Sequence, residues 1–288
     1  MTPQHALELR GVWNRYPGFT LKDVSFTLPR GAIGGLIGPN GSGKTTIVKL
    51  VMNLVRRDAG EIRVFGLDNR ASEVEVKSRI GFVYDVPGFW DDRSLDAHRR
   101  ALGAFYPRWS DRTFRRLAEE FALPLDATFK TLSHGAKTKF ALAIAMAHHA
   151  DLLLLDEPTS GLDPVFRREL LDHPAAAVAD GRSSVVFSTH ITGDLERMAD
   201  YITFVREGRL VFSSTREEVF DRWVVVKGDP RLLDGRTRAL LAGVEVTPHA
   251  FTGLSGDAAA ARAALAGTGA IIERATLEDV MYLTGRSC

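Results

Sequence analysis

A glycine-rich stretch near the N-terminus has the residue types that can cradle a phosphate group. The nine residues are Gly38, Pro39, Asn40, Gly41, Ser42, Gly43, Lys44, Thr45 and Thr46. They match the pattern G-x-x-x-x-G-K-[ST], in which glycines let consecutive backbone N–H groups face one phosphate. Lys44 is then expected to reach the outer phosphates, and the Thr45 hydroxyl is expected to bind Mg²⁺. The alternative is a plain glycine-rich turn with a solvated lysine.

A phosphate loop needs a strand before it and a helix after it. Residues 32–37 form an apolar run of buried-strand length, and apolar residues recur at helical spacing from Ile47 to Leu54. A helix beginning at the loop adds the partial positive charge of its N-terminus. This context favours phosphate binding over a plain turn.

A pair of acidic residues further along the chain could supply a metal ligand and a base. Asp156 and Glu157 directly follow four consecutive leucines, residues 152–155. Continuous apolar runs are typical of parallel strands covered on both faces, and α/β sheets bind ligands at the carboxyl ends of such strands. We expect Asp156 to hold Mg²⁺, through water, and Glu157 to act as general base toward a water molecule. The alternative is that the pair caps the strand before Pro158.

The rest of the chain alternates expected strands and helices, which predicts α/β architecture. Strands are expected at residues 7–9, 23–28, 32–37, 60–66, 80–84, 152–155 and 184–188. From about Pro87 to Ala150 the sequence pattern predicts helices, with Ser110 as a helix N-cap and a helix at about 136–148. No further metal ligand is spaced to join His148 and His149, so we interpret them as solvated or capping residues. A helix is expected at 164–179, with a break near His173 because Pro174 lacks an N–H.

The composition changes after about residue 215. Short strands are expected at 224–226, 244–246 and 271–272, with a final helix after Thr276, and we find no chemistry there. We therefore predict a main domain over residues 1–215, with a helical subdomain at about 86–150, and a small α/β accessory region at 216–288.

Composition narrows the possible partners and compartment. The 288 residues are 45% hydrophobic and 25% charged, and the net charge of +1 provides no basic field for nucleic acid. Cys288 is the only cysteine, which excludes an intrachain disulfide and fits a reducing compartment. No run approaches the roughly 18 apolar residues of a membrane span, and the N-terminus has no signal-peptide core. Any work at a membrane is expected to require another polypeptide.

The ordered motifs resemble those of ATP-binding-cassette (ABC) ATPases, specifically the nucleotide-binding subunits of transporters, over about residues 5–215. The matching residues in chain order are Tyr16 as the aromatic that packs on adenine, 38–46 as Walker A, 132–137 as the LSGGQ-like signature, 156–160 as Walker B, 160–163 as the D-loop and 188–190 as the switch-histidine segment. The resemblance implies a P-loop NTPase core of the ABC type with an antiparallel β subdomain and a helical subdomain. It implies ATP and Mg²⁺ as cofactors and ATP hydrolysis as the activity.

The same resemblance implies partners. Ser133 and Gly135 close over ATP that is held by a second subunit, which is another copy or a paralogue. Asp163 links the two sites, and His190 contacts the γ-phosphate. A separate integral membrane permease is implied, so the chain is expected on the cytoplasmic face of the membrane, and no nucleic-acid partner is expected. Phe89 and Trp90 are candidates for the permease contact, with internal packing as the alternative.

Two departures from the family pattern stand out. Asp85 occupies the position of the family's Q-loop glutamine, where it either ligates Mg²⁺ or caps a turn. In the signature, His134 replaces a glycine and Ala136 replaces a glutamine, whereas Ser133 and Gly135 are retained. Together with the aromatic residues after Asp85, these features resemble the bacterial YtrB-like cassette subunits, which are related to drug and peptide exporters.

Two rival functions remain. A soluble cassette ATPase could act on nucleic acid or ribosomes, but such translation factors carry two cassettes in one chain, and chromosome ATPases separate the Walker motifs by long coiled coils. No sustained heptads separate Lys44 from Asp156. A regulator that binds ATP without turnover is the third reading, and the presence of Glu157 and His190 argues against it. The function that we expect is the ATP-hydrolysing subunit of a bacterial transporter, with export as the direction.

Overall fold

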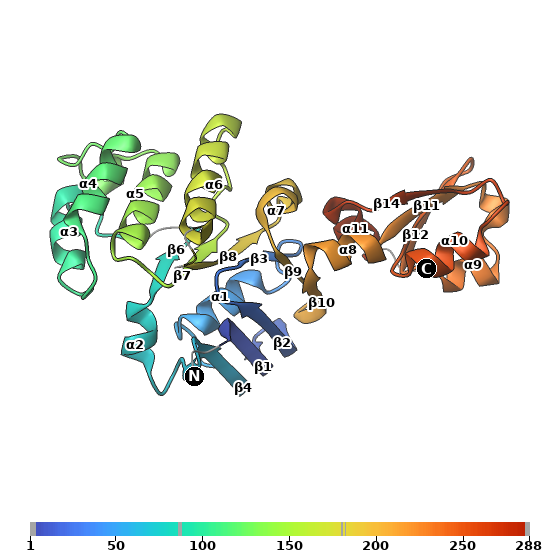
Figure 1. Ribbon diagram of the computed structural model, residues 1–288, viewed down its shortest axis with the longest axis horizontal. Helices are drawn as coiled ribbons and strands as arrows, with labels where there is room; N and C mark the ends of the chain where they lie inside the picture. The colour runs from blue at the N-terminus through green and yellow to red at the C-terminus, as the bar shows by residue number, and fades with distance from the viewer. Residues whose placement is uncertain (1–3, 86–87, 180, 182, 286–288) are drawn as a thin grey trace. The chain divides into compact units, whose positions relative to one another are not determined.

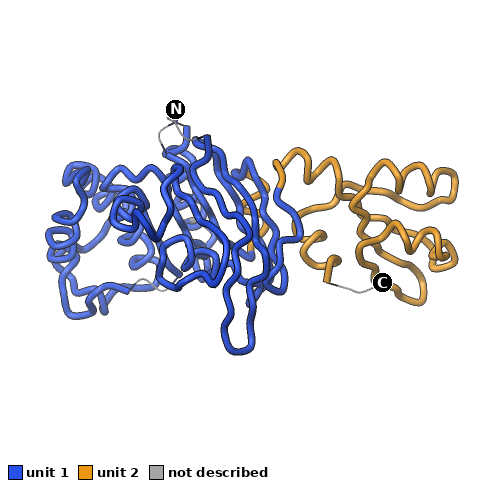
Figure 2. The backbone as a smooth tube through the Cα atoms, turned by 90° about the horizontal axis from the view of Figure 1, so that it is seen from below, with its two compact units in different colours: residues 1–190, 198–213 blue, residues 191–197, 214–288 orange. Residues whose placement is uncertain are grey.

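The structure is a computed structural model that describes residues 4–85, 88–179, 181 and 183–285. The chain divides into two compact units, coloured separately in Figure 2. The first contains residues 1–190 and 198–213, and the second contains residues 191–197 and 214–288. Residues 86 and 87 of the expected helical subdomain, and Cys288, lie outside the described residues. The domain boundary at residue 215 stays a prediction.

The first unit begins with an antiparallel sheet in the order β2-β1-β4-β5. Its strands are β1 (His5–Tyr16), β2 (Phe19–Pro29), β4 (Ala59–Val64) and β5 (Leu67–Asp68). Along β2 the buried residues alternate with less buried ones, because one face of the sheet packs on the core through Val24, Phe26 and Leu28. The β1–β2 hairpin turns at Pro17 and Gly18, which places Tyr16 and Phe19 next to each other across the strands.

The central sheet of the first unit has six strands in the order β10-β9-β3-β8-β7-β6. They are β3 (Ile33–Ile37), β6 (Ile80–Val83), β7 (Leu152–Asp156), β8 (Ser184–Thr189), β9 (Tyr201–Arg206) and β10 (Arg209–Thr215). The five strands from β9 to β6 run parallel, and every residue of β7 and β8 is buried, as continuous apolar runs predict. The carboxyl ends of β3, β8 and β7 therefore lie side by side.

Helices surround this sheet. They are α1 (Lys44–Val51), α2 (Glu73–Ser78), α3 (Leu95–Gly103), α4 (Asp111–Glu120), α5 (His134–Ala147) and α6 (Pro164–Ala179), with a 3₁₀ turn at Phe129–Thr131. Figure 1 shows α3, α4 and α5 grouped together, and Ser110 caps α4 by accepting from Thr113 N. Phe89 packs on Phe129 and Phe140 inside this group, whereas Trp90 is 56% exposed.

Three local expectations differ in detail from the structure. Helix α6 continues through Pro174, which is itself buried and follows the buried Leu170 and the contact of His173 with Phe121. Helix α5 begins two residues earlier than expected, at His134, because Ser133 is its N-cap. His148 is not solvated, since it is 1% exposed and stacks on Tyr106 at 4.0 Å between ring centroids, but it occupies the C-cap position of α5, in agreement with the capping alternative.

The second unit has its own antiparallel sheet in the order β12-β13-β11-β14. Its elements are α7 (Thr192–Met198), α8 (Arg216–Arg222), β11 (Val224–Gly228), a 3₁₀ turn at Pro230–Leu232, α9 (Gly235–Ala239), β12 (Gly243–Val246), β13 (Phe251–Ser255), α10 (Ala258–Ala264), β14 (Ile271–Arg274) and α11 (Leu277–Leu283). From β11 to β14 this is a split βαβ arrangement around a core that includes Val224, Val226 and Phe251. Within the described residues, no helix has the length and apolarity needed to cross a bilayer.

Candidate functional site

The phosphate loop connects β3 to α1, as predicted from the sequence. Its glycines are needed for the backbone shape: φ is +77° at Gly41 and +113° at Gly43. At Gly38, a Cβ atom would lie only 2.1 Å from the carbonyl oxygen of Val205, so no larger residue fits without moving the loop. The loop is thus held in a compact curve that leads directly into the N-terminus of α1.

Lys44 lies inside this loop, with only 5% of its surface exposed. Its Nζ donates to the carbonyl oxygens of Gly38, at 2.8 Å, and Pro39, at 3.4 Å. It also lies 3.2 Å from Oε1 of Glu157, which comes from the end of a different strand. The buried ammonium is therefore positioned between the loop and the acidic residues.

Asp156 ends β7 beneath the loop and is fully buried. Burial raises the pKa of its carboxyl group, and hydrogen bonds from Ser188 and Thr45 act in the opposite direction. Ser188 Oγ donates to Oδ1 at 2.8 Å, whereas Oδ2 has no hydrogen-bond partner among the residues that the structure describes. A buried carboxylate oxygen without a partner, beside a threonine hydroxyl, fits a hard cation such as Mg²⁺ that takes oxygen ligands.

Glu157 is held between two basic side chains. Its Oε1 faces Lys44, and its Oε2 lies 2.8 Å from Nδ1 of His190 and also accepts from the His190 backbone N–H at 3.3 Å. The backbone of Glu157 is left-handed, with φ of +48°, which is costly for a residue with a side chain and is commonly found at functional sites. Its N–H donates to the carbonyl oxygen of Ser188, so the neighbouring strand β8 holds this turn.

Lys44, Thr45, Glu157 and His190 line one open pocket of about 730 Å³, and Asp156 is buried at the end of β7. The predicted residues that line it are Tyr16, Asn40, Gly41, Ser42, Gly43, Lys44, Thr45, Thr46, Asp85, Glu157 and His190. Gly18 and Phe19 also line it and were not predicted, and Ser160, which lines it too, was named only as part of the Walker B and D-loop motifs. Phe19 could have been suspected, because it directly follows the hairpin turn at Pro17 and Gly18 and pairs with Tyr16 across the strands. Ser188 was predicted only as part of a motif, and its contact with Asp156 follows from the β7–β8 register.

Six predicted residues are not among those that line this pocket. Gly38 and Pro39 belong to the loop itself and Asp156 is buried at the end of β7, whereas Ser133, Gly135 and Asp163 belong to the signature segment and the D-loop. Ser133 Oγ accepts from Ala136 N at 3.2 Å, and Gly135 occupies the first turn of α5 against Leu162. Asp163 Oδ1 accepts from Phe166 N at the start of α6. The signature segment and the D-loop are therefore in contact with each other within one chain, but the signature does not reach the phosphate loop of the same chain.

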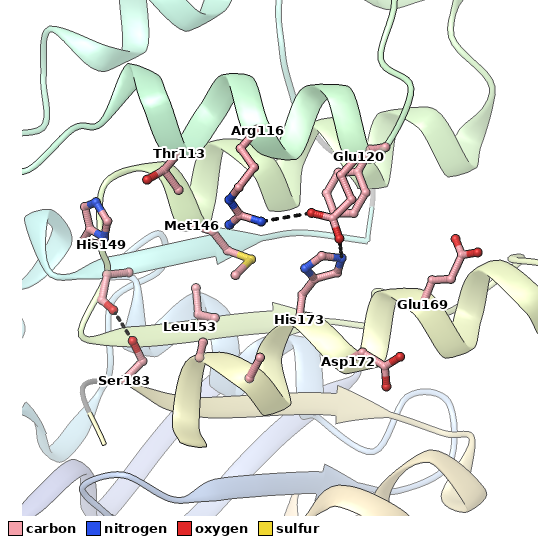
Figure 3. Close-up of a pocket in the computed structure, with 14 residues that line it drawn as sticks. Thr113, Arg116, Glu120, Met146, His149, Leu153, Glu169, Asp172, His173 and Ser183 are labelled. Atoms are coloured by element: carbon pink, nitrogen blue, oxygen red, sulfur yellow. Dashed lines mark hydrogen bonds and ion pairs between the residues drawn. The ribbon is translucent and has the colours of Figure 1, made fainter. Parts of the chain in front are cut away.

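A second pocket, of about 810 Å³, lies between α4, α6 and the amino end of β7 (Figure 3). Two of its basic groups are paired with one acid: Arg116 Nη1 lies 3.1 Å and His173 Nε2 lies 3.5 Å from the carboxylate of Glu120. Burial lowers the pKa of His173, which favours its neutral form. This pocket contains no glycine loop, so we assign the phosphate chemistry to the pocket at the strand ends.

Comparison with known proteins agrees with this geometry. A family model described as ABC transporter matches residues 21–160. The chain is 30% identical over 207 residues to the ABC transporter ATP-binding protein YtrB of Bacillus subtilis (strain 168). The aligned region covers 72% of this chain and 70% of that protein. It is 28% identical over 300 residues to the Nod factor export ATP-binding protein I of Burkholderia lata, which covers 99% of this chain and 98% of that protein.

A solved structure of the ATP-binding subunit of an ABC transporter superposes with a TM-score of 0.68 at 27% identity, covering 74% of this chain and 91% of that one. The predicted fold class, a P-loop NTPase core of the ABC type, is thereby confirmed. The rival reading as a soluble factor that acts on nucleic acid or ribosomes gains no support. The chain therefore belongs to the ABC transporter family, as one of its ATP-binding proteins, which hydrolyse ATP to power transport.

Proposed function

We propose that this chain works as a dimer around two Mg-ATP molecules and drives a separate membrane-spanning subunit. The observation that carries the proposal is that Glu157 contacts two basic side chains next to the phosphate loop. Its Oε1 lies 3.2 Å from Lys44 Nζ, and its Oε2 lies 2.8 Å from His190 Nδ1. Phosphate-binding residues, a buried acidic residue with an unpartnered oxygen and a paired base in one pocket are the parts that phosphoryl transfer to water needs.

Each side chain has a distinct task in this proposal. The loop N–H groups and Lys44 bind the phosphates, and Tyr16 at the pocket edge packs on the adenine. Thr45 and Asp156, with Asp85 nearby, would hold Mg²⁺, which neutralises charge on the phosphate oxygens when it is bound. Glu157 accepts a proton from the attacking water through a carboxylate oxygen, and His190 orients that carboxylate through Nδ1.

The position of the signature supports dimerisation. Ser133 and Gly135 lie outside the pocket of their own chain, so a second subunit is required if they are to close over the nucleotide. The test is the ATPase rate as a function of protein concentration. The specific activity should fall on dilution as dimers dissociate, and a specific activity that stays constant down to nanomolar protein would contradict the dimer.

The membrane partner rests on the relatives and on one exposed side chain. The relatives are ATP-binding proteins of transporters, and one of them is named for export, which supports an exporter on the inner face of the cell membrane. Trp90 is exposed near the start of the α3–α5 group, where it can contact a partner. Purification from membranes should recover a multi-span protein with the wild-type chain and less of it with Trp90→Ala. Equal recovery would remove Trp90 from the contact.

A further inference from the structure

His134 makes a contact that the family's glycine at this position cannot make. Its Nε2 lies 3.1 Å from the carbonyl oxygen of Ser160, and a carbonyl acceptor requires Nε2 to carry the proton. The same ring packs beside Gly161, whose Cβ position would be 3.6 Å from His134 Cδ2. The first residue of α5 is thus hydrogen-bonded to the turn that follows Glu157.

That turn belongs to the nucleotide pocket. Ser160 lines the pocket, and its N–H donates to the carbonyl oxygen of Glu157 at 3.1 Å. Because Glu157 has a left-handed backbone, neighbouring contacts must hold the turn in place. The bond from His134 is one such contact, and it comes from the signature segment and not from the sheet.

We propose that His134 is a positioning residue that couples the signature of each subunit to the Glu157 turn of its own hydrolytic site. The inference rests on the proposed function, in which the signature closes over the nucleotide of the second subunit. Closure at one site then acts, through His134 and Ser160, on the base of the other site. His134 is not among the residues that line the nucleotide pocket of its own chain, so it acts there through Ser160.

Two amide variants form a matched test. In His134→Gln the amide nitrogen can reach the position of Nε2, whereas the shorter side chain of His134→Asn places it near the position of Nδ1, out of reach of Ser160. His134→Gly restores the family residue. The control is His249→Asn, the same change at an exposed residue of the second unit.

The first readout needs no nucleotide. Amide hydrogen exchange of Ser160 and Leu162, both hydrogen-bonded within the turn, should speed up about fivefold in His134→Asn and His134→Gly. It should stay at the wild-type rate in His134→Gln and His249→Asn. Exchange that rises across the whole first unit, or equally in the Gln and Asn variants, overturns the proposal.

The second readout is the ATPase reaction. The Asn and Gly variants should lose about fivefold in kcat with an unchanged KM for ATP, and the Gln variant should retain wild-type kcat. Wild-type kcat in all three variants, or a loss that appears only in KM, overturns the role of His134. A failure of the proposed dimer is seen separately, because the specific ATPase activity of the wild-type chain would then stay constant on dilution to nanomolar protein.

Discussion

Replacing Glu157 by glutamine separates ATP binding from hydrolysis. The amide keeps the size of the side chain and can still accept from His190 through its oxygen, but it cannot take a proton from water. Lys44 keeps its bonds to Gly38 and Pro39, so the loop does not lose its internal support. We therefore expect the variant to fold and to bind ATP.

The size of the effect follows from the role of a positioned base. General-base catalysis contributes about 10²- to 10⁴-fold to the rate, which corresponds to about 3 to 5 kcal/mol in the activation barrier. The ion pair with Lys44 contributes little to the loss of rate, because a neutral partner leaves the lysine close to the phosphates. We expect kcat to fall at least 100-fold while the dissociation constant of ATP changes by less than about tenfold.

The assay is single-turnover hydrolysis of ATP together with equilibrium binding of a fluorescent ATP analogue. Glu207→Gln is the matched control, because Glu207 also has a left-handed backbone, with φ of +49°, and its side chain is 83% exposed. Wild-type turnover in Glu157→Gln would refute the assignment of the base. Equal losses in both variants would show that the effect comes from backbone strain and not from proton transfer.

Three further predictions follow from single residues. Asp85→Gln should raise the Mg²⁺ concentration for half-maximal ATPase activity about tenfold, whereas an unchanged Mg²⁺ titration would leave Asp85 as a turn residue. Gly38→Ala should abolish ATP binding and lower the free energy of unfolding by about 2 kcal/mol or more, because its Cβ would clash with Val205. The control is Gly31→Ala, where φ is positive but nothing lies close to the new Cβ. It should lower the free energy of unfolding, measured by thermal unfolding, by only about 1 kcal/mol. Burial lowers the pKa of His148 to about 4 from 6.5, so the unfolded chain binds a proton between these pH values that the folded chain does not. The free energy of unfolding should therefore be unaffected by His148 above pH 7 and fall by about 3 kcal/mol as the pH drops to 4, and His148→Phe should remove that part of the dependence in urea unfolding.

The parts of the fold that were predictable are those in which the local residues determine the local structure. The glycines of the phosphate loop are required by its backbone, and the four leucines before Asp156 are required by a strand buried on both faces. Strand β13 was missed because Gly253 interrupts a short segment of modest β propensity, and only pairing with β11 and β12 stabilises it. Helix α6 passes through Pro174 because tertiary contacts outweigh a local preference.

In the candidate site too, some features follow from the local residues and others from tertiary contacts. Residue types were enough to propose which side chains bind phosphate and metal, but the contacts among these side chains depend on strand register. Asp156 and Ser188 are partners across the parallel strands β7 and β8, so Ser188 can bond both the carboxylate of Asp156 and the N–H of Glu157. His190, two residues beyond Ser188, then meets Glu157 from the adjacent strand end.

This register also explains why the signature needs an added contact. Asp156, Glu157 and His190 are placed by neighbouring strands of one sheet, and a shift of either strand would separate them. Ser133 and His134 lie on a helix of the α3–α5 group, which has no strand pairing to the Glu157 turn. Their position relative to that turn depends on side-chain contacts such as His134 with Ser160. Substitutions of His134 should therefore lower the rate of hydrolysis, while the pocket at the ends of the strands still binds nucleotide.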